Sequence, residues 1–265
     1  MTGRLVLALA GGLLAAFLAL PVATLVARAL GDGELAGALA SPTVRDALVL
    51  SLATTAASLA ITVLVGTPLA FALARRRFPG AGIVEVIVDL PLVLPPSVAG
   101  LALLLVFGRR GLLGDTLDAA GLAIPFTAIA VVLAQVFVAA PFYVRAARAG
   151  ISTVPRDLED AARVDGASEP GVFRHVLLPL AAPALAAGLV MSWARSLGEF
   201  GATILFAGNV AGRTQTLPLV VYAEFGAGDL EAAIAAATVL VLAAVGVLAA
   251  VRLGRRGRVL DAAAA

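Results

Sequence analysis

The chain has few residues that could carry out covalent chemistry or bind a metal ion. Ser192 and Ser196 lie in one apolar stretch, and a serine beside a histidine can act as a nucleophile with its base. The only histidine, His175, falls outside that stretch, and one histidine without any cysteine cannot build a multi-histidine or thiolate metal site. All the basic side chains that carry a permanent charge are arginine, so a phosphate-binding loop would lack its lysine. We therefore expect no catalytic site, no bound metal and no cofactor.

Three ionisable residues stand within or at the ends of apolar stretches, namely Asp89, Arg195 and Glu199. In an apolar environment such groups usually face other parts of the protein and are paired. Arg195 and Glu199 are four residues apart, a spacing that allows an ion pair along one helix. A structural ion pair and a gate in a transport pathway both fit this pattern.

Prolines interrupt another apolar stretch. Pro91, Pro95 and Pro96 remove three backbone donors within six residues, so a helix there should be kinked or unwound. Broken helices expose backbone groups, which suits a hydrated pathway, although a packing kink would leave the same pattern. Pro95, Pro96 and the following Ser97 are therefore candidates for the lining of a pathway.

A polar run, Arg213 to Thr216, follows a partly apolar segment near residue 205. An arginine with neighbouring hydroxyl and amide donors can guide a tetrahedral oxyanion. The docking of another protein explains Arg213 and Thr214 equally well.

The stretch from residue 150 to 176 has the pattern of two short helices joined by a turn. Pro155 and Asp157 can start a helix, because acidic residues in a first turn are favoured by the helix dipole. Ala161 and Ala162 would give that helix a smooth face that another protein can approach closely. Gly166 then allows the chain to turn with a positive φ.

Apolar helices must position all these residues. Hydrophobic residues make up 61% of the 265 residues, only 14% are charged, and the mean hydropathy is +1.04. Soluble domains carry about 25% charged residues, so lipid must be the outer solvent here. We predict an all-α, polytopic membrane protein with a single domain over residues 1–265. Its six spans, each long enough for a bilayer, are expected at residues 5–27, 47–73, 84–107, 124–144, 177–199 and 230–251.

The distribution of arginine predicts the orientation, because cytoplasmic loops are enriched in basic residues. One set of loops holds most of them: Arg4, Arg75, Arg76, Arg77, Arg145, Arg148, Arg156, Arg163, Arg174, Arg252, Arg255, Arg256 and Arg258. The other set holds Arg28, Arg45, Arg109, Arg110 and Arg213. We expect both termini in the cytoplasm, and an uncleaved first span in preference to a cleaved signal peptide. The arginines flank the spans without forming one patch, so we expect no nucleic acid partner.

The run from Asp160 to Pro179 resembles the EAA loop of ABC importer permeases. In that motif Glu-Ala-Ala and Gly are separated by three residues, and Gly and Ile-x-Leu-Pro are separated by nine. The matching residues here are Asp160, Ala161, Ala162, Gly166, Val176, Leu178 and Pro179. The resemblance implies that this loop docks on a cytoplasmic ATPase. It assigns coupling to Glu159, Asp160, Ala161, Ala162, Gly166 and Ala167, whereas an ordinary amphipathic surface loop is the alternative.

Two further stretches, residues 89–100 and 197–218, look like the molybdate permease subfamily, and the second is shared in part with sulfate and tungstate permeases. The resemblance covers most of residues 45–250. It implies a type I ABC importer permease fold, a homodimer, two cytoplasmic ATPase subunits and an extracytoplasmic oxyanion-binding protein. We expect transport of molybdate across the cytoplasmic membrane, with sulfate, tungstate or another oxyanion as the alternative. A passive channel and an intramembrane serine protease leave the loop unexplained.

Overall fold

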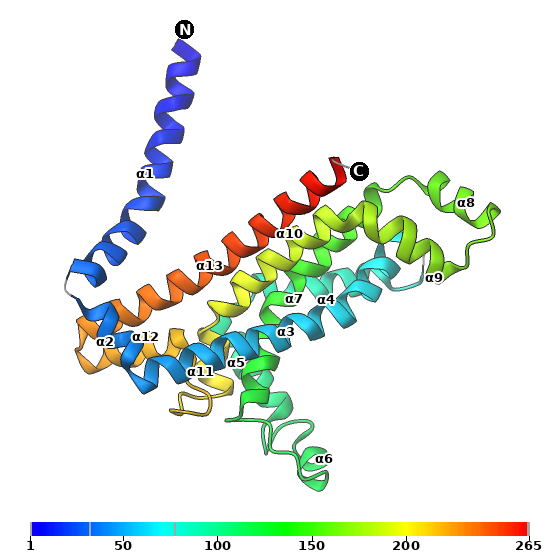
Figure 1. Ribbon diagram of the computed structural model, residues 1–265. Coiled ribbons are helices and arrows are strands. Elements are labelled where there is room, and N and C mark those ends of the chain that lie inside the picture. Colours follow the sequence, from blue (N-terminus) through cyan, green and yellow to red (C-terminus); the bar gives the residue numbers. More distant parts are fainter. Residues whose placement is uncertain (1, 32, 77, 264–265) are drawn as a thin grey trace. The chain divides into compact units, whose positions relative to one another are not determined.

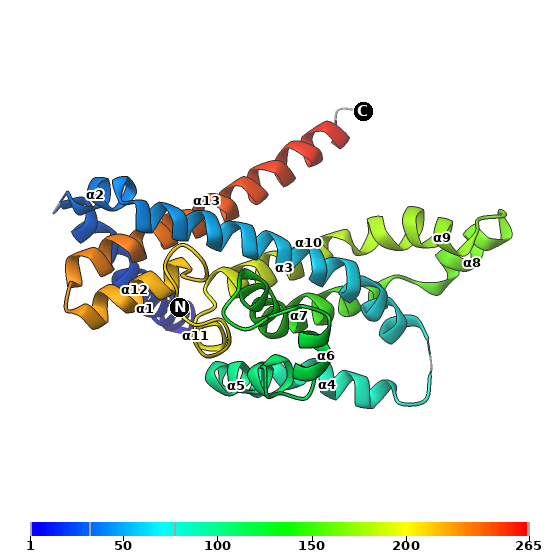
Figure 2. The same ribbon diagram turned by 90° about the horizontal axis from the view of Figure 1, so that it is seen from below.

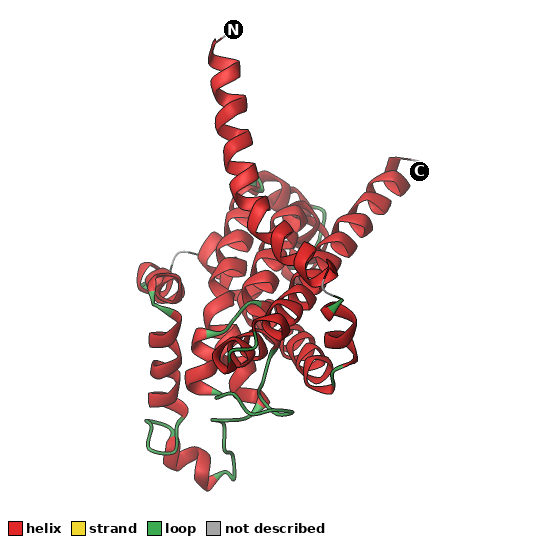
Figure 3. Cartoon of the chain, turned by 90° about the vertical axis from the view of Figure 1, so that its left-hand side faces the viewer, coloured by secondary structure: helices red, strands yellow, loops and turns green. Residues whose placement is uncertain are grey.

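The computed structural model describes residues 2–31, 33–76 and 78–263, and within them every regular element is a helix (Figure 3). Arg77, which entered the predicted orientation, lies outside the described residues. The helices, in chain order, are α1 (Thr2–Gly31), α2 (Glu34–Ala40), α3 (Pro42–Arg75), α4 (Ala81–Val93), α5 (Pro96–Phe107), α6 (Gly114–Ala119), α7 (Ala128–Thr153), α8 (Arg156–Val164), α9 (Glu169–Val172), η1 (Phe173–Leu177), α10 (Leu178–Leu197), α11 (Gly201–Phe206), α12 (Leu217–Ala227) and α13 (Leu230–Ala263).

Five helical stretches are long and apolar enough to cross a membrane: Gly3–Gly31, Pro42–Arg75, Ala128–Thr153, Glu169–Leu197 and Leu230–Ala249. A sixth crossing is possible through the pair α4 and α5, whose axes bend by 120°. The prediction of an all-α, multi-pass membrane protein is therefore confirmed. Helix α7 runs nine residues beyond the predicted end of the fourth span, to Thr153, because an α-helix does not have to stop where the hydrocarbon layer stops.

The predicted break in the third span lies between α4 and α5. Leu94 has left the helix, with φ −68° and ψ 131°, and Pro95 follows with φ −54° and ψ 136°. A residue that precedes a proline avoids the α region, which explains why α4 ends here and why Pro96 can begin a new helix. Pro91 does not break the chain, because it stays inside α4.

The chain folds as two compact units, Met1–Leu48 with Thr216–Ala265, and Val49–Gln215. In the first unit α2, α12 and α13 pack around Val44, Leu217 and Val239, and α1 contacts α2 and α13. The predicted single domain remains a prediction. All the geometry described below belongs to the second unit.

Helices α7 and α10 are the centre of the Val49–Gln215 unit and run alongside each other (Figures 1 and 2). Glycine permits this close contact, since a Cβ on Gly188 would lie 2.7 Å from the Cβ of Ala146. Towards one end, α3, α7 and α10 enclose Ala70, Tyr143 and Leu177, and towards the other, α5, α7 and α11 enclose a second apolar core. The two cores fix both ends of α7.

A π-helical turn, η1, joins α9 to α10 without interrupting the helix from Glu169 to Leu197. The N–H of Leu178 donates to the carbonyl of Phe173, five residues back. Pro179 explains this wider turn, because proline has no N–H and its ring collides with the carbonyl four residues earlier in an α-helix. The π-helical turn thus allows the helix to continue through Pro179 without a break.

Candidate functional site

The loop between α7 and α10 has the predicted two-helix geometry, and Gly166 makes its turn. Helix α8 ends with Gly166 at φ +90°. The N–H of Ala167 donates to Ala162 (2.9 Å) and that of Gly166 to Arg163 (3.0 Å), which is a Schellman ending. Ser168 then caps α9 by accepting a hydrogen bond from the N–H of Gly171. The turn therefore has one defined conformation.

Arg163 holds the two short helices together. Its Nε donates to Glu169 at the start of α9 (2.7 Å), and its Nη1 donates to Asp160 one turn back in α8 (2.7 Å). The hydrogen bond to Glu169 is the main reason that the pKa of Arg163 is raised above its usual value, so the guanidinium stays charged. The ion pairs of Arg163 with Asp160 and Glu169 are exposed, and together they orient α9 against α8.

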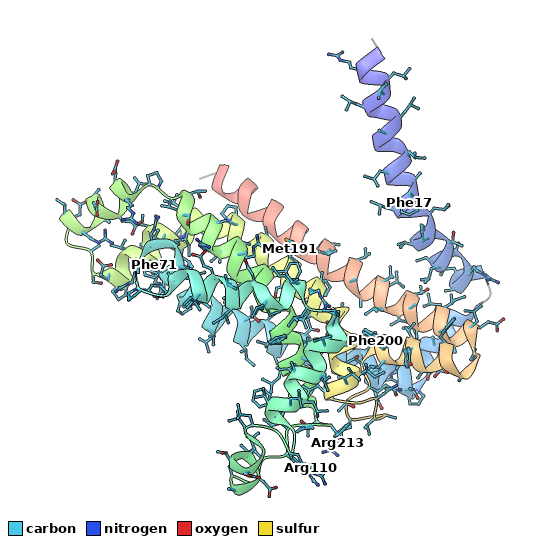
Figure 4. All side chains as sticks on the ribbon, turned by 180° about the vertical axis from the view of Figure 1, so that it is seen from behind. Phe17, Phe71, Arg110, Met191, Phe200 and Arg213 are labelled. Carbon is cyan, nitrogen blue, oxygen red and sulfur yellow. The ribbon has the colours of Figure 1, made fainter. Side chains whose placement is uncertain are left out.

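Glu159 ties the loop to α3. Its carboxylate is 4% exposed and lies 2.9 Å from Nη2 of Arg75, the last residue of α3. The same Nη2 donates to the carbonyl of Val154 (2.7 Å), at the end of α7. An edge-on contact between Phe71, labelled in Figure 4, and Phe173, with ring centroids 5.5 Å apart, adds a second link from α3 to the loop. The family resemblance assigns Glu159 to the coupling loop, and the structure buries its side chain against α3.

The outer side of α8 is exposed and partly apolar. Leu158 is 46% exposed and Val164 is 87% exposed, and Ala161 between them is exposed as well. Asp160, Gly166 and Ala167 are also exposed, and Ala162 is half-buried. Covering an apolar side chain as open as Val164 would lower the free energy, so this face is a candidate contact surface.

Arg195 and Glu199 form the ion pair that their spacing predicts. Nη1 of Arg195 lies 2.6 Å from Oε2 of Glu199, which is 1% exposed. Glu199 stands just beyond the end of α10, and its Oε1 accepts a hydrogen bond from the N–H of Ala202 (2.7 Å). The pair therefore joins the end of α10 to the first turn of α11. Asp89 differs, because it is more open and lies 3.8 Å from Arg145.

Helix α11 in turn lies against the broken span. A Cβ on Gly201 would come within 2.7 Å of the Cβ of Pro96, and one on Gly100 would meet the carbonyl oxygen of Ala202 at 2.6 Å. Only glycine fits at either contact. Pro95, Pro96 and Ser97 themselves are exposed at the bend, so the predicted candidates stand at an open surface that is supported by Glu199 and α11.

Sequence reasoning missed a set of buried polar side chains between α3, α7 and α10. The amide of Gln135 donates to Thr55 (3.4 Å) and to the carbonyl of Ser196 (3.2 Å). The hydroxyls of Ser58 and Ser196 lie 3.1 Å apart. The repeat of hydroxyl residues on one face of α3, every three or four positions, was the available signal: Ser51, Thr54, Thr55, Ser58 and Thr62 are all buried.

The contacts of Ser192 and Ser196 also argue against a serine–histidine dyad with His175. The hydroxyl of Ser192 donates to the carbonyl of Ala139 (2.9 Å), and Ser196 faces Ser58. His175 is exposed, with Nδ1 3.1 Å from the carbonyl of Gly171. His175 and Ser192 share one continuous helix, along which 17 residues span about 25 Å.

Within the predicted polar run, Arg213 and Thr214 have different environments. Thr214 is buried and closes its own turn, since its hydroxyl accepts from the N–H of Val210 (3.0 Å). Arg213 is exposed and lines a pocket of about 430 Å³ together with Arg109 and Thr127. Arg213 is labelled in Figure 4, at the end of the unit that also carries Arg110. Of the two residues proposed from sequence, only Arg213 is therefore open to a ligand.

Comparison with known proteins gives consistent relatives. The molybdenum transport system permease protein ModB of Mycobacterium tuberculosis is 46% identical over 204 residues, covering 77% of either chain. The probable transport system permease protein NifC of Clostridium pasteurianum is 40% identical, over 79% of this chain and 73% of its own. The sulfate transport system permease protein CysT of Salmonella typhimurium is 37% identical, over 72% of this chain and 71% of its own.

Solved structures agree on the fold. A bacterial ABC transporter that imports the acidic polysaccharide alginate matches with a TM-score of 0.67 and 18% identity, over 82% of this chain and 80% of that one. The MetNI methionine ABC transporter matches with a TM-score of 0.63 and 20% identity, over 81% and 95%. The fold is that of type I ABC importer permeases. Residues 63–259 match the profile of the binding-protein-dependent transport system inner membrane component, and the chain belongs to that family of permeases.

Proposed function

We propose that the chain is the permease subunit of an ABC importer that carries molybdate across the cytoplasmic membrane. ATP hydrolysis in a partner subunit drives it, and the chain itself has no ATPase site. The observation that carries this proposal is the α8–α9 loop, which presents an open apolar face and is attached behind that face to α3 and to the end of α7.

The loop offers a route for mechanical coupling. A partner that covers Ala161 and Val164 would move α8, and the Arg75–Glu159 pair would pass this motion to α3. The unbroken helix from Glu169 to Leu197 would carry the same motion to Glu199 and α11, which support the bend at Pro96. Gly166 and Ala167 keep the loop in its docking shape, and Asp160 contributes through Arg163.

The working assembly in this proposal is a homodimer with two ATPase subunits and an extracytoplasmic oxyanion-binding protein. Both termini of the chain face the cytoplasm. A relative in the alginate transporter was solved with a substrate-bound periplasmic protein, which makes a similar partner reasonable for this chain. Closure of the ATPases would rock the spans and open the pathway outwards, and hydrolysis would reset it.

The coupling step can be tested by placing a charge on the open face of α8. Ala161→Asp should abolish uptake and the stimulation of ATPase activity by the binding protein, because a carboxylate would have to be buried at the contact. The matched control is Ser152→Asp, which adds the same charge at an exposed position outside α8. Gly166→Pro should have the same effect as Ala161→Asp. Normal coupled transport in both loop variants would disprove the docking assignment.

The cargo is tested separately, by competition. Uptake of labelled molybdate by cells with the full transporter should be inhibited more strongly by tungstate than by sulfate. Sulfate, the alternative cargo, is supported by the similarity to CysT at 37% identity. Preferential uptake of sulfate would replace molybdate in the proposal and leave the coupling mechanism unchanged.

A further inference from the structure

The pocket that Arg109 and Arg213 share contains two arginines that no carboxylate of the described residues pairs with. The structure pairs five other arginines of this unit with carboxylates: Arg75, Arg145, Arg148, Arg163 and Arg195. Within the described residues, no acidic oxygen lies within ion-pair distance of Arg109 or Arg213. Two positive charges therefore face one cavity without neutralisation by the chain.

Both arginines are presented by backbone that is held in place. Arg109 follows α5 in a turn closed by hydrogen bonds from Gly111 to Gly108 (2.8 Å) and from Leu112 to Leu105 (2.9 Å). Arg213 stands in the turn that Thr214 closes onto Val210, so its backbone is equally fixed. The two side chains come from loops more than 100 residues apart in sequence, yet they line the same cavity. This convergence is a property of the fold.

The walls of the pocket strengthen the effect of these charges. Leu104, Ala123, Pro125 and Phe126 line it beside the two arginines, and Thr127 adds a hydroxyl. Apolar walls lower the local dielectric constant and focus the field of the arginines into the cavity. Phe126 is held there by backbone, since its N–H donates to the carbonyl of Phe206 and its ring fills the space over Gly208, where a Cβ would lie 2.8 Å away.

We propose that this pocket is an entry site for a tetrahedral oxyanion, in which Arg109 and Arg213 receive the anion before it passes into the membrane. The proposal rests on the function and orientation proposed above, because the pocket lies at the end of α7 opposite the α8–α9 loop. The cavity, about 430 Å³, is larger than a bare oxyanion. The anion would keep part of its hydration shell there, so binding would be weak and release fast.

The first test measures anion binding to the purified chain. Molybdate or sulfate at constant ionic strength should raise the melting temperature of the wild type. Arg109→Gln with Arg213→Gln should abolish that rise, and Arg110→Gln should keep it, because Arg110 is exposed next to Arg109 but does not line the pocket. An equal rise in the double variant would overturn the entry site.

The second test measures uptake by the full transporter with limiting binding protein. We expect a loss of about tenfold in the double variant, because steering by unneutralised charge accelerates encounter by about that factor or more. The affinity for the binding protein should be unchanged, and uptake should depend less on salt than in the wild type. A loss of uptake explained fully by weaker docking of the binding protein would overturn the proposal and make the two arginines a protein contact.

The two tests separate this proposal from the proposed function. Arginine-dependent stabilisation by oxyanions in a chain whose wild-type transporter takes up no oxyanion would support the pocket and refute the importer. Normal uptake in the double variant, without any stabilisation by oxyanions of the wild type, would refute the pocket and leave the importer intact.

Discussion

Two pairs of arginines, one near each end of α7, differ in their partners. Near its last turn, Arg75 and Arg163 are held by carboxylates, and their guanidinium groups join α3, α8 and α9 into one structure. Near its first turn, Arg109 and Arg213 line a pocket with no acidic partner among the described residues. Paired charges stabilise a shape that can transmit force, whereas unpaired charges leave a field that can attract an anion. Stability measurements on matched variants can therefore test whether the difference is real.

The largest effect is expected from Glu159→Ala. Removal of this carboxylate leaves Arg75 in a site where its side chain is only 9% exposed, and breaking a buried pair costs about 3 kcal/mol of unfolding free energy. Thermal unfolding of the purified chain would measure the loss. Asp160→Ala is the control, because Asp160 is the neighbouring carboxylate on α8 but is exposed and pairs with Arg163 instead of Arg75. Equal stability of the two variants would mean that the Arg75–Glu159 pair does not hold the loop.

An intermediate effect is expected from alanine at the turn glycines of the two ends. Gly166 has φ +90° and Gly212 has φ +69°, with open space around both, so Gly166→Ala and Gly212→Ala should each cost about 1 kcal/mol through backbone strain alone. The functional consequences should differ. The first should impair ATPase coupling and the second should impair uptake, and a shared defect would undermine the division between the two ends.

A small effect on stability is expected from Arg163→Gln. The ion pairs of Arg163 are exposed, and such pairs contribute little in water. The melting temperature should stay almost constant, while coupled ATPase activity falls because α9 is no longer oriented against α8. Full ATPase coupling in this variant would show that the exposed cluster has no part in transmission.

The smallest change in stability is expected at the pocket. Arg109→Gln and Arg213→Gln remove charges that have no carboxylate partner among the described residues, so the melting temperature in the absence of oxyanions should not fall. A clear loss of stability in these variants would mean that the pocket arginines are structural, and the contrast between the two ends of α7 would disappear.

The sequence predicted those parts of the structure that depend on local chemistry. Apolar length gave the spans, prolines gave the break at Pro95, and Gly166 gave the turn of the loop, because each of these acts within a few residues. The burial of Glu159 was not predicted, because its partner, Arg75, comes from a helix 84 positions earlier. The sequence likewise did not indicate that Arg109 and Arg213 share a pocket, because the two residues lie in distant loops. Contacts of this kind follow from how helices pack, which no local pattern specifies.

The hydroxyl set around Gln135 illustrates a second limit. Its members are ordinary serines and threonines inside apolar stretches, where such residues often bond to their own helix. Only the packing of α3 against α7 and α10 turns Ser58 and Ser196 into partners. The local role of Thr214 was likewise not evident from sequence, since its hydroxyl bonds within its own turn.

The π-helical turn at Phe173–Leu177 has a consequence for insertions and deletions in this family. A π turn is an α-helix with one residue added, and each residue of an α-helix turns the axis by about 100°. Deletion of one residue from this turn would rotate α9 about α10 by roughly that angle. Glu169 would then move away from Arg163, so the length of this five-residue segment sets the rotational orientation of α9, and with it of α8, relative to α10.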